Sequence, residues 1–204
     1  MIKIEHTEVF GWSAAIRGMR NAMNSWDKSD SYWTHIEDAE TLETAPFAFF
    51  MGENDLKLAK SLSKGGDDHG KFLRMINVQL DITAPIYWWK EADTYRVGKE
   101  QNSCSTMHKI HAKEFVREDF SVEHVPHTGL YGECVEVVIN ALNTARKAYL
   151  LTKDKSFWWQ MIQLLPSSYN QRRTVQLNYQ VLKNMYFARR HHKLDEWRKF
   201  CAWC

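Results

Sequence analysis

The chain has 204 residues, and 27 Lys and Arg residues against 25 Asp and Glu residues give a formal net charge of +2. This balance excludes proteins that mainly bind a nucleic-acid backbone or an anionic membrane surface. Hydrophobic residues at 44% and charged residues at 25% exclude a disordered or fibrous chain. The apolar runs are far shorter than the roughly 18 residues that cross a bilayer, and no signal peptide is recognisable. We expect one globular domain over residues 1–204, located in the cytoplasm.

Alternation of apolar and polar residues predicts strands over residues 2–10 and 74–83. Helical spacing predicts helices over residues 13–24, 54–64 and 85–95, with Asn54 as the N-cap of the second. Proline is favoured in the first turn of a helix, so Pro85 begins the third. The polar segments 25–44 and 96–107 lack a period and are predicted to be loops.

The second half of the chain is predicted to be helical. Apolar residues at helical spacing indicate helices over residues 131–152 and 157–165, and Pro166 ends the latter. After a turn at 167–170, apolar residues between Val175 and Met185 predict a helix that ends near Arg189. A last helix is expected from about residue 194.

The numbers of cysteines and of aromatic residues indicate the redox state and the packing of the chain. The four cysteines at 104, 134, 201 and 204 are too few for a disulfide framework, so we expect reduced thiols. The 9 Trp, 10 Phe and 8 Tyr residues either fill a core or an oligomer interface, or line a site for a flat ligand.

Metal binding and nucleophilic catalysis have weak support in the sequence. Histidines at 108 and 111, histidines at 124 and 127, and cysteines at 201 and 204 form close pairs, but only one pair contains cysteine, so no metal site is expected. Cys104 has His108 four residues later, which is suggestive of a nucleophile beside a base, although a loop cysteine is the simpler interpretation.

Residues 81–108 combine a strand end, an Ala-Pro pair, an aromatic helix, an arginine and a Ser-rich loop. This order resembles the flavin-dependent thymidylate synthases, the ThyX family. In that family the helix that starts at Ala-Pro ends in an Arg-His-Arg triplet, and a serine of the nucleotide-binding loop follows after seven residues. Here the triplet position reads Thr94-Tyr95-Arg96, and the serine position falls at Cys104 between Ser103 and Ser105.

Three further stretches are similar to the family. His69 precedes the second predicted strand as a family histidine does, and the segment 11–20 resembles the Arg-rich first helix, with Arg17 and Arg20 in register. Downstream, a Leu-Pro pair, two asparagines and an arginine recur at the family spacing as Leu165-Pro166, Asn178, Asn184 and Arg189.

The resemblance implies the fold and the activity. The fold would be α/β (α+β), a single domain with a central mixed or antiparallel sheet, flanking helices and a helical C-terminal half. The enzyme would methylate dUMP to dTMP, with methylenetetrahydrofolate as carbon donor, FAD as hydride carrier and NADPH as a further co-substrate. Family members are homotetramers that hold FAD across subunit interfaces, so a homotetramer is implied too.

The resemblance also implies roles for individual residues. His69, Lys71, Arg96, Asn178 and Asn184 would bind the flavin cofactor. The substrate dUMP would be bound by Glu91, Asn102, Ser103, Cys104, Ser105 and Arg189. Among these, Arg189, Cys104 and Ser105 are the candidate catalytic residues, although the family mechanism requires no cysteine nucleophile.

The triplet departs from the family pattern, because two of its three cations are replaced by Thr94 and Tyr95. Lys90, Lys99, Arg172 or Arg173 could supply the missing charge. Three alternatives therefore stay open: a flavin enzyme that acts on another pyrimidine nucleotide, a fold relative that binds a nucleotide or a protein without synthase activity, and an oligomer that shares only the architecture.

Overall fold

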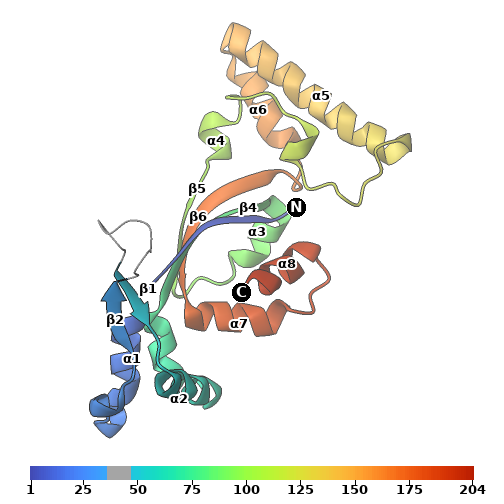
Figure 1. Cartoon of the computed structure of the whole chain (residues 1–204). Coiled ribbons are helices and arrows are strands. Elements are labelled where there is room, and N and C mark those ends of the chain that lie inside the picture. The colour runs from blue at the N-terminus through green and yellow to red at the C-terminus, as the bar shows by residue number, and fades with distance from the viewer. Residues whose placement is uncertain (36–46) are drawn as a thin grey trace, which may run out of the picture.

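The computed structural model describes residues 1–35 and 47–204. Four antiparallel strands form the central sheet in the order β1 (Lys3–Phe10), β4 (Asn77–Pro85), β6 (Asn170–Asn178) and β5 (Lys99–Ser103). Figure 1 shows the sheet in the middle of the molecule, with helices at both ends and along one side. The mixed fold predicted from the sequence, a sheet with flanking helices, is therefore confirmed, and the sheet is antiparallel.

The two faces of the sheet differ in polarity. Alternate residues of β4 and β6, including Val78, Leu80, Val175 and Leu177, are at most 2% exposed and form the central core. Three helices supply the rest of this core: α3 (Ile86–Ala92), α7 (Tyr179–Arg189) and α8 (Asp195–Trp203). The opposite face carries polar side chains, which is usual for an antiparallel sheet covered on one side.

Helix α3 begins where β4 ends because the 167–169 turn satisfies its first amide groups. The amide of Ile86 donates to the carbonyl of Tyr169 and that of Tyr87 to the carbonyl of Ser167, each at 3.0 Å. The first amides of a helix have no partner inside the helix, so an outside acceptor is needed when they are buried. Pro85, which has no amide hydrogen, is the N-cap.

A second core lies at the N-terminal end of the molecule. Helices α1 (Trp12–Arg20) and α2 (Glu53–Lys64) and the 3-10 helix η3 (Gly70–Met75) enclose it. The short 3-10 helices η1 (Asn21–Met23) and η2 (Trp26–Lys28) follow α1, and a separate hairpin pairs β2 (Tyr32–His35) with β3 (Phe47–Phe50).

A buried ion pair joins these N-terminal elements. Arg20 Nε donates to Asp55 Oδ1 at 2.6 Å, and the two side chains are 5% and 0% exposed. The hydroxyls of Ser29 and Ser31 donate to the second carboxylate oxygen of Asp55, each at 2.6 Å. Arg20 therefore does not share an exposed face with Arg17, but ties α1 to α2 and to the 29–31 segment.

A third core lies at the other end of the molecule. The long helix α5 (Gly129–Thr152) packs on α6 (Lys155–Leu164), with α4 (Thr106–Lys109) and η4 (Arg117–Asp119) beside them. Asn143, a polar residue in this core, accepts a hydrogen bond from the amide of Phe115 at 2.9 Å and donates to its carbonyl at 2.8 Å. The side chain thus satisfies an irregular segment that would otherwise leave buried backbone groups unpaired.

Two sequence predictions about the central sheet are wrong. Residues 170–178 form the central strand β6 and not the start of a helix, because Val175 and Leu177 belong to a two-residue alternation that ends before the helical spacing of α7 begins. Residues 99–103, predicted to be a loop, form the edge strand β5. Its side chains are almost all polar, so no alternation marked it.

Other boundaries shift by a few residues. Residues 74–75 belong to η3, and β2 lies inside the predicted loop 25–44, of which residues 36–44 fall outside the described residues. The N-cap of α2 is Gly52 and not Asn54. Asp30 supplies the capping acceptor instead, at 2.9 Å from the amide of Asn54 and 3.0 Å from that of Asp55. No helix among the described residues combines the length and apolar character needed to cross a membrane.

Much of the aromatic content is accounted for by packing. Trp88, Trp89, Trp197 and Phe200 are at most 1% exposed and contact one another in the central core. Burial of such large rings is a major favourable contribution to folding. The core interpretation therefore holds for these four residues.

We predict that Arg20→Ala lowers the free energy of unfolding by roughly 3 kcal/mol, because it leaves the Asp55 carboxylate buried without its cation. The matched control is Arg17→Ala, an exposed arginine of the same helix, which should change stability by less than about 0.5 kcal/mol. Urea denaturation measures both. Equal effects of the two substitutions would contradict the structural role of the pair.

Candidate functional site

The predicted nucleotide loop borders a cavity at one end of the sheet. Cys104 follows β5, is exposed, and is held by backbone: its amide donates to the carbonyl of Arg172 at 2.9 Å, and its carbonyl accepts from Gln171 Nε2 at 2.8 Å. Ser105 is the N-cap of α4, where its hydroxyl accepts from the amides of Met107 and His108, each at 3.2 Å. Both residues line a cavity of about 670 Å³.

The cavity has the size of a small-ligand site and an excess of basic side chains. Five basic residues line it, namely Lys3, Lys109, Lys113, Arg117 and Arg172, against the three acidic residues Glu118, Asp119 and Glu123. Several are paired: Lys113 with Asp119, and Arg117 with Glu136 at 3.2 Å. Lys109 makes no ion pair with any residue of 1–35 or 47–204, so its ammonium is available to an anion.

Arg172, which lines the cavity, belongs to a charge cluster on the polar face of the sheet. Asp81 accepts hydrogen bonds from Thr174 at 2.6 Å and from Arg172 at 2.5 Å, and His6 Nδ1 lies 3.0 Å away. These hydrogen bonds, that of Thr174 foremost, hold the pKa of Asp81 well below its ordinary value. Arg172 is therefore a fixed cation between this carboxylate and the cavity.

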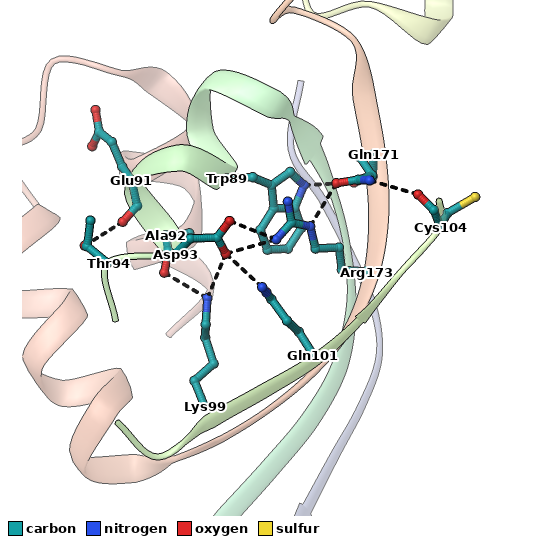
Figure 2. A network of polar contacts seen from close by, with 10 residues as sticks. All are labelled: Trp89, Glu91, Ala92, Asp93, Thr94, Lys99, Gln101, Cys104, Gln171 and Arg173. Atoms are coloured by element: carbon teal, nitrogen blue, oxygen red, sulfur yellow. Dashed lines mark hydrogen bonds and ion pairs between the residues drawn. The ribbon is translucent and has the colours of Figure 1, made fainter. Parts of the chain in front are cut away.

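A second polar network lies on the other face of the sheet and connects α3 to the Cys104 segment (Figure 2). Asp93 is at its centre and accepts from Gln101 at 2.8 Å, from Arg173 Nη1 at 2.9 Å and from Lys99 at 3.4 Å. The guanidinium of Arg173 also stacks over Trp89 at 4.2 Å and donates to Gln171. Because Gln171 in turn donates to the Cys104 carbonyl, the end of α3 is linked rigidly to the loop.

The network sets the charge of its members. Partial burial acts to raise the pKa of Asp93, but the hydrogen bonds from Gln101 and Arg173 and the charge of Lys99 outweigh it and lower the pKa below 3.8. Burial lowers the pKa of Lys99, whose side chain is only 6% exposed. Asp93 stays ionised at neutral pH and neutralises Arg173, so Arg173 is not a free replacement for the missing triplet cations.

The predicted substrate residues Glu91 and Arg189 do lie together. Arg189 Nη1 donates to Glu91 Oε2 at 3.0 Å, and Arg189 Nε donates to the hydroxyl of Tyr95 at 3.0 Å. The same Glu91 oxygen accepts from Trp197 Nε1 at 2.9 Å, and the Arg189 guanidinium lies 4.9 Å from the centre of the Trp197 ring. This cluster presents a fixed planar cation at 22% exposure, and Tyr95, one of the two departures from the triplet, helps to hold it.

The predicted flavin residues of α7 lie near the 67–70 segment. Asn178 was predicted to lie on a helix, but it is the last residue of β6 and the N-cap of α7. Its Oδ1 accepts a hydrogen bond from the amide of Val181 at 3.0 Å. Asn184, exposed on α7, accepts a hydrogen bond from Gln180 Nε2 at 2.9 Å. Gln180 Nε2 also donates to Asp67 Oδ1 at 3.3 Å. Gln180 Oε1 is buried and has no hydrogen-bond partner among the described residues.

The other predicted flavin residues are a histidine, a lysine and an arginine, and all three are exposed to solvent. His69 precedes η3 and is exposed, as is Lys71, whose nearest carboxylate is Asp68 at 3.9 Å. Arg96 lies exposed in the turn between α3 and β5. Asn102 and Ser103 are exposed on β5, opposite Thr174 and Arg173.

The predicted residues thus fall into three groups on one chain. The first is the Cys104–Ser105 cavity, the second is the Glu91–Arg189 cluster, and the third is the region of Asn184 and His69 beside Gln180. The cavity beside Cys104 and Ser105 is lined neither by Glu91 and Arg189 nor by Asn184 and His69.

No protein-family model matches the sequence, and no curated protein is similar to it. The fold, however, is similar to solved structures of thymidylate synthase X (ThyX) from Helicobacter pylori with FAD and dUMP. One matches with a TM-score of 0.69 and 14% identity over 99% of this chain and 90% of that one. Another matches with a TM-score of 0.67 and 16% identity over 98% and 90%. This chain has the ThyX fold.

The ThyX fold accounts for the resemblance seen in the sequence, since it extends over nearly the whole chain. The structure also adds residues that the sequence analysis missed. Lys109, Lys113 and Arg117 recur every four residues beside the cavity, and that spacing was the available signal. Gln180 and Asp93 had none, because their importance arises only from tertiary contacts.

We predict that Asp93→Asn lowers the free energy of unfolding by about 1 kcal/mol at pH 7, because Lys99 and Arg173 lose their carboxylate. The effect is modest because Asp93 is 41% exposed and solvent screens part of the interaction. The folded-state pKa of Asp93 lies below its ordinary value of 3.8, so the stabilisation is present above that pH and is lost as the pH falls. Urea denaturation should therefore separate variant and wild type at pH 7 and show a smaller difference near pH 3.

The control for this prediction is Asp68→Asn, which alters a carboxylate that is 96% exposed and should have almost no effect at either pH. A difference between wild type and Asp93→Asn that did not shrink in acid would contradict the electrostatic role assigned to Asp93.

Proposed function

We propose that the chain is a flavin-dependent enzyme that methylates a pyrimidine nucleotide, dUMP in the first instance. The single observation that carries the proposal is the ThyX fold over 99% of the chain, shared with structures that hold FAD and dUMP. The basic cavity beside Cys104 supports it, because that loop is the one that resembles the family's nucleotide loop. The protein would act as one domain in the cytoplasm.

The nucleotide phosphate would bind at the Cys104–Ser105 cavity. Lys109, whose ammonium has no ion-pair partner in the described part of the chain, and Arg172, whose guanidinium is fixed by Asp81, both line the cavity. They would form charge-assisted hydrogen bonds with phosphate oxygens. Ser105, whose oxygen already accepts two amides, still has its hydroxyl proton to donate. Cys104 would contact the ligand as a small side chain and not as a nucleophile.

Arg189 would orient the pyrimidine. Glu91 and Tyr95 fix two of its nitrogens, and Nη2 makes no hydrogen bond within the part of the chain that the structure describes. A planar cation held in this way is a better partner for a carbonyl or phosphate than a flexible ammonium. Its role would be to place the base and stabilise developing negative charge on it.

The residues around α7 fit a flavin nucleotide in their donor chemistry. The buried Gln180 Oε1, which has no hydrogen-bond partner within residues 1–35 and 47–204, lies beside Asn184 and the 67–70 segment. Exposed donors suited to a diphosphate are Lys71, Arg96 and His69. FAD, when bound, would carry the hydride, with methylenetetrahydrofolate as carbon donor and NADPH as reductant. The protein's part would be to bind and orient these groups.

A homotetramer would explain why the candidate residues fall into three groups. Residues at the surface of one chain can meet those of another chain when symmetric copies pack together. In this proposal the cavity of one copy and the α7 region of another complete a site together.

We predict that the purified protein binds FAD and that dUMP shifts the flavin absorbance spectrum. Arg189→Ala should abolish the shift by dUMP, because the base loses its positioning cation, whereas the exposed neighbour Arg190→Ala should preserve it. Asn184→Ala should weaken FAD binding about tenfold, the effect of one lost hydrogen bond, and Asn54→Ala on α2 should not. Absorbance titration measures all of these.

A protein that takes up no FAD at high micromolar concentration would overturn the enzyme proposal and favour a fold relative with another role. FAD binding without a response to dUMP, but with a response to another pyrimidine nucleotide, would keep the flavin and replace the substrate.

We predict in addition that dUMP protects Cys104 from alkylation. At saturating dUMP the labelling rate of Cys104, followed by peptide mass spectrometry, should fall at least fivefold, because the ligand covers the exposed thiol. Deoxyuridine, which lacks the phosphate, should protect poorly. Lys109→Ala should raise the dUMP concentration needed for protection by about tenfold. Equal protection by dUMP and deoxyuridine would contradict a phosphate site at this cavity.

A further inference from the structure

The outward face of α5 carries a regular stripe of apolar and small residues. Its members follow one another at alternating intervals of four and three: Leu130, Cys134, Val137, Ala141, Thr144, Ala148 and Leu151. The larger ones are strongly exposed, with Leu130 at 70%, Val137 at 66% and Leu151 at 85%. A mean interval of 3.5 residues is the spacing of a helix that packs along a second helix.

The stripe does not belong to the core of the chain itself. The residues of α5 that pack into the third core, among them Val135, Ile139, Leu142 and Tyr149, occupy the other side of the helix. Helix α5 lies at one end of the molecule, and α6, α4 and η4 approach it from the side of that core (Figure 1). The apolar stripe is therefore a surface that the chain leaves uncovered.

Charged residues beside the stripe show which partner fits it. Glu133, Asn140 and Lys147 are exposed and flank the stripe at intervals of seven residues. Neither Glu133 nor Lys147 makes an ion pair with any residue of 1–35 or 47–204. An identical helix in antiparallel orientation would place Glu133 against Lys147 twice and Asn140 against itself. In a parallel copy the same three positions would face Val138, Ala145 and Thr152, so neither charge would meet a partner.

We propose that α5 pairs antiparallel with α5 of a second copy of this chain about a two-fold axis near residue 139. In this register Leu130 packs on Ala148, Val137 packs on Ala141, and Cys134 packs on Thr144 of the other copy. A larger side chain thus meets a smaller one in the apolar layers, and Glu133 pairs with Lys147 on the rim. The surface is self-complementary, as a two-fold interface requires.

The proposal goes beyond the flavin chemistry and does not depend on it. A two-fold pairing of α5 can exist whether or not the chain binds FAD or dUMP, and its test uses the protein without either ligand. Glu133 and Lys147 lie outside the three groups of candidate site residues.

The test measures the mass of the full chain by sedimentation equilibrium at micromolar concentration. Wild type should be an even-numbered oligomer. Glu133→Lys and Lys147→Glu should each weaken the α5 association at least tenfold, because each creates two like-charge contacts, and should halve the mass. The double variant Glu133→Lys with Lys147→Glu should recover the wild-type mass. Lys57→Glu on α2 has the same charge change at the other end of the molecule and should leave the mass unchanged.

Accessibility of Cys134 supplies a second readout. The thiol is exposed on the single chain and lies inside the proposed interface, so it should be alkylated slowly in wild type and at least tenfold faster in Lys147→Glu. A monomeric wild type, a mass insensitive to both charge reversals, or a double variant no better than the single ones would each overturn the proposal. The last result would point to a different partner for the stripe.

Discussion

The antiparallel pairing of β4 with β6 is the constraint on which the rest of the structure depends. Nine residue pairs, from Asn77 opposite Asn178 to Pro85 opposite Asn170, join two segments that lie almost a hundred residues apart. Because the strands run in opposite directions, α3 starts at one end of the sheet and α7 at the other. Both helices then lie on the same apolar face, and the end of α7 brings Arg189 to Glu91 near the end of α3. The register thus creates the cluster that no local sequence feature specifies.

The same pairing sorts the charges of the site onto two faces. Arg172 and Arg173 are neighbours in β6, so their side chains point to opposite sides of the sheet. Arg172 pairs with Asp81 beside the basic cavity, and Arg173 pairs with Asp93 against Trp89. Each guanidinium is immobilised by a carboxylate. For Arg173, whose side chain is 12% exposed, an unpaired charge would be costly, whereas Arg172 is 49% exposed and its pairing mainly fixes its position. A ligand at the cavity therefore meets a preorganised cation, and the mobile contribution comes from Lys109.

The sequence predicted the helices well and the sheet only in part. Strands β1 and β4 were recognisable because their alternation is regular, and α5 and α8 because their apolar spacing is helical. Strand β5 was not, since its stability comes from pairing with β6 and not from its own side chains. For the candidate site, the resemblance named Cys104, Glu91 and Arg189, and their roles stay predictions. The carboxylate partners Asp81 and Asp93 could not be found that way, because only the folded register brings them to their cations.

The departures from the family triplet have a physical explanation in this register. Thr94 donates from its hydroxyl to the carbonyl of Glu91 and so closes the last turn of α3, while the hydroxyl oxygen of Tyr95 accepts a hydrogen bond from Arg189 Nε. Tyr95 thus helps to fix Arg189, and Thr94 stabilises the end of the helix that carries Glu91. The lost positive charge is not restored by Lys99 or Arg173, which Asp93 neutralises, but the cavity lining beyond Cys104 holds an excess of basic residues. The basic residues next to the Cys104 loop therefore lie in the cavity lining, namely Lys109, Lys113, Arg117 and Arg172.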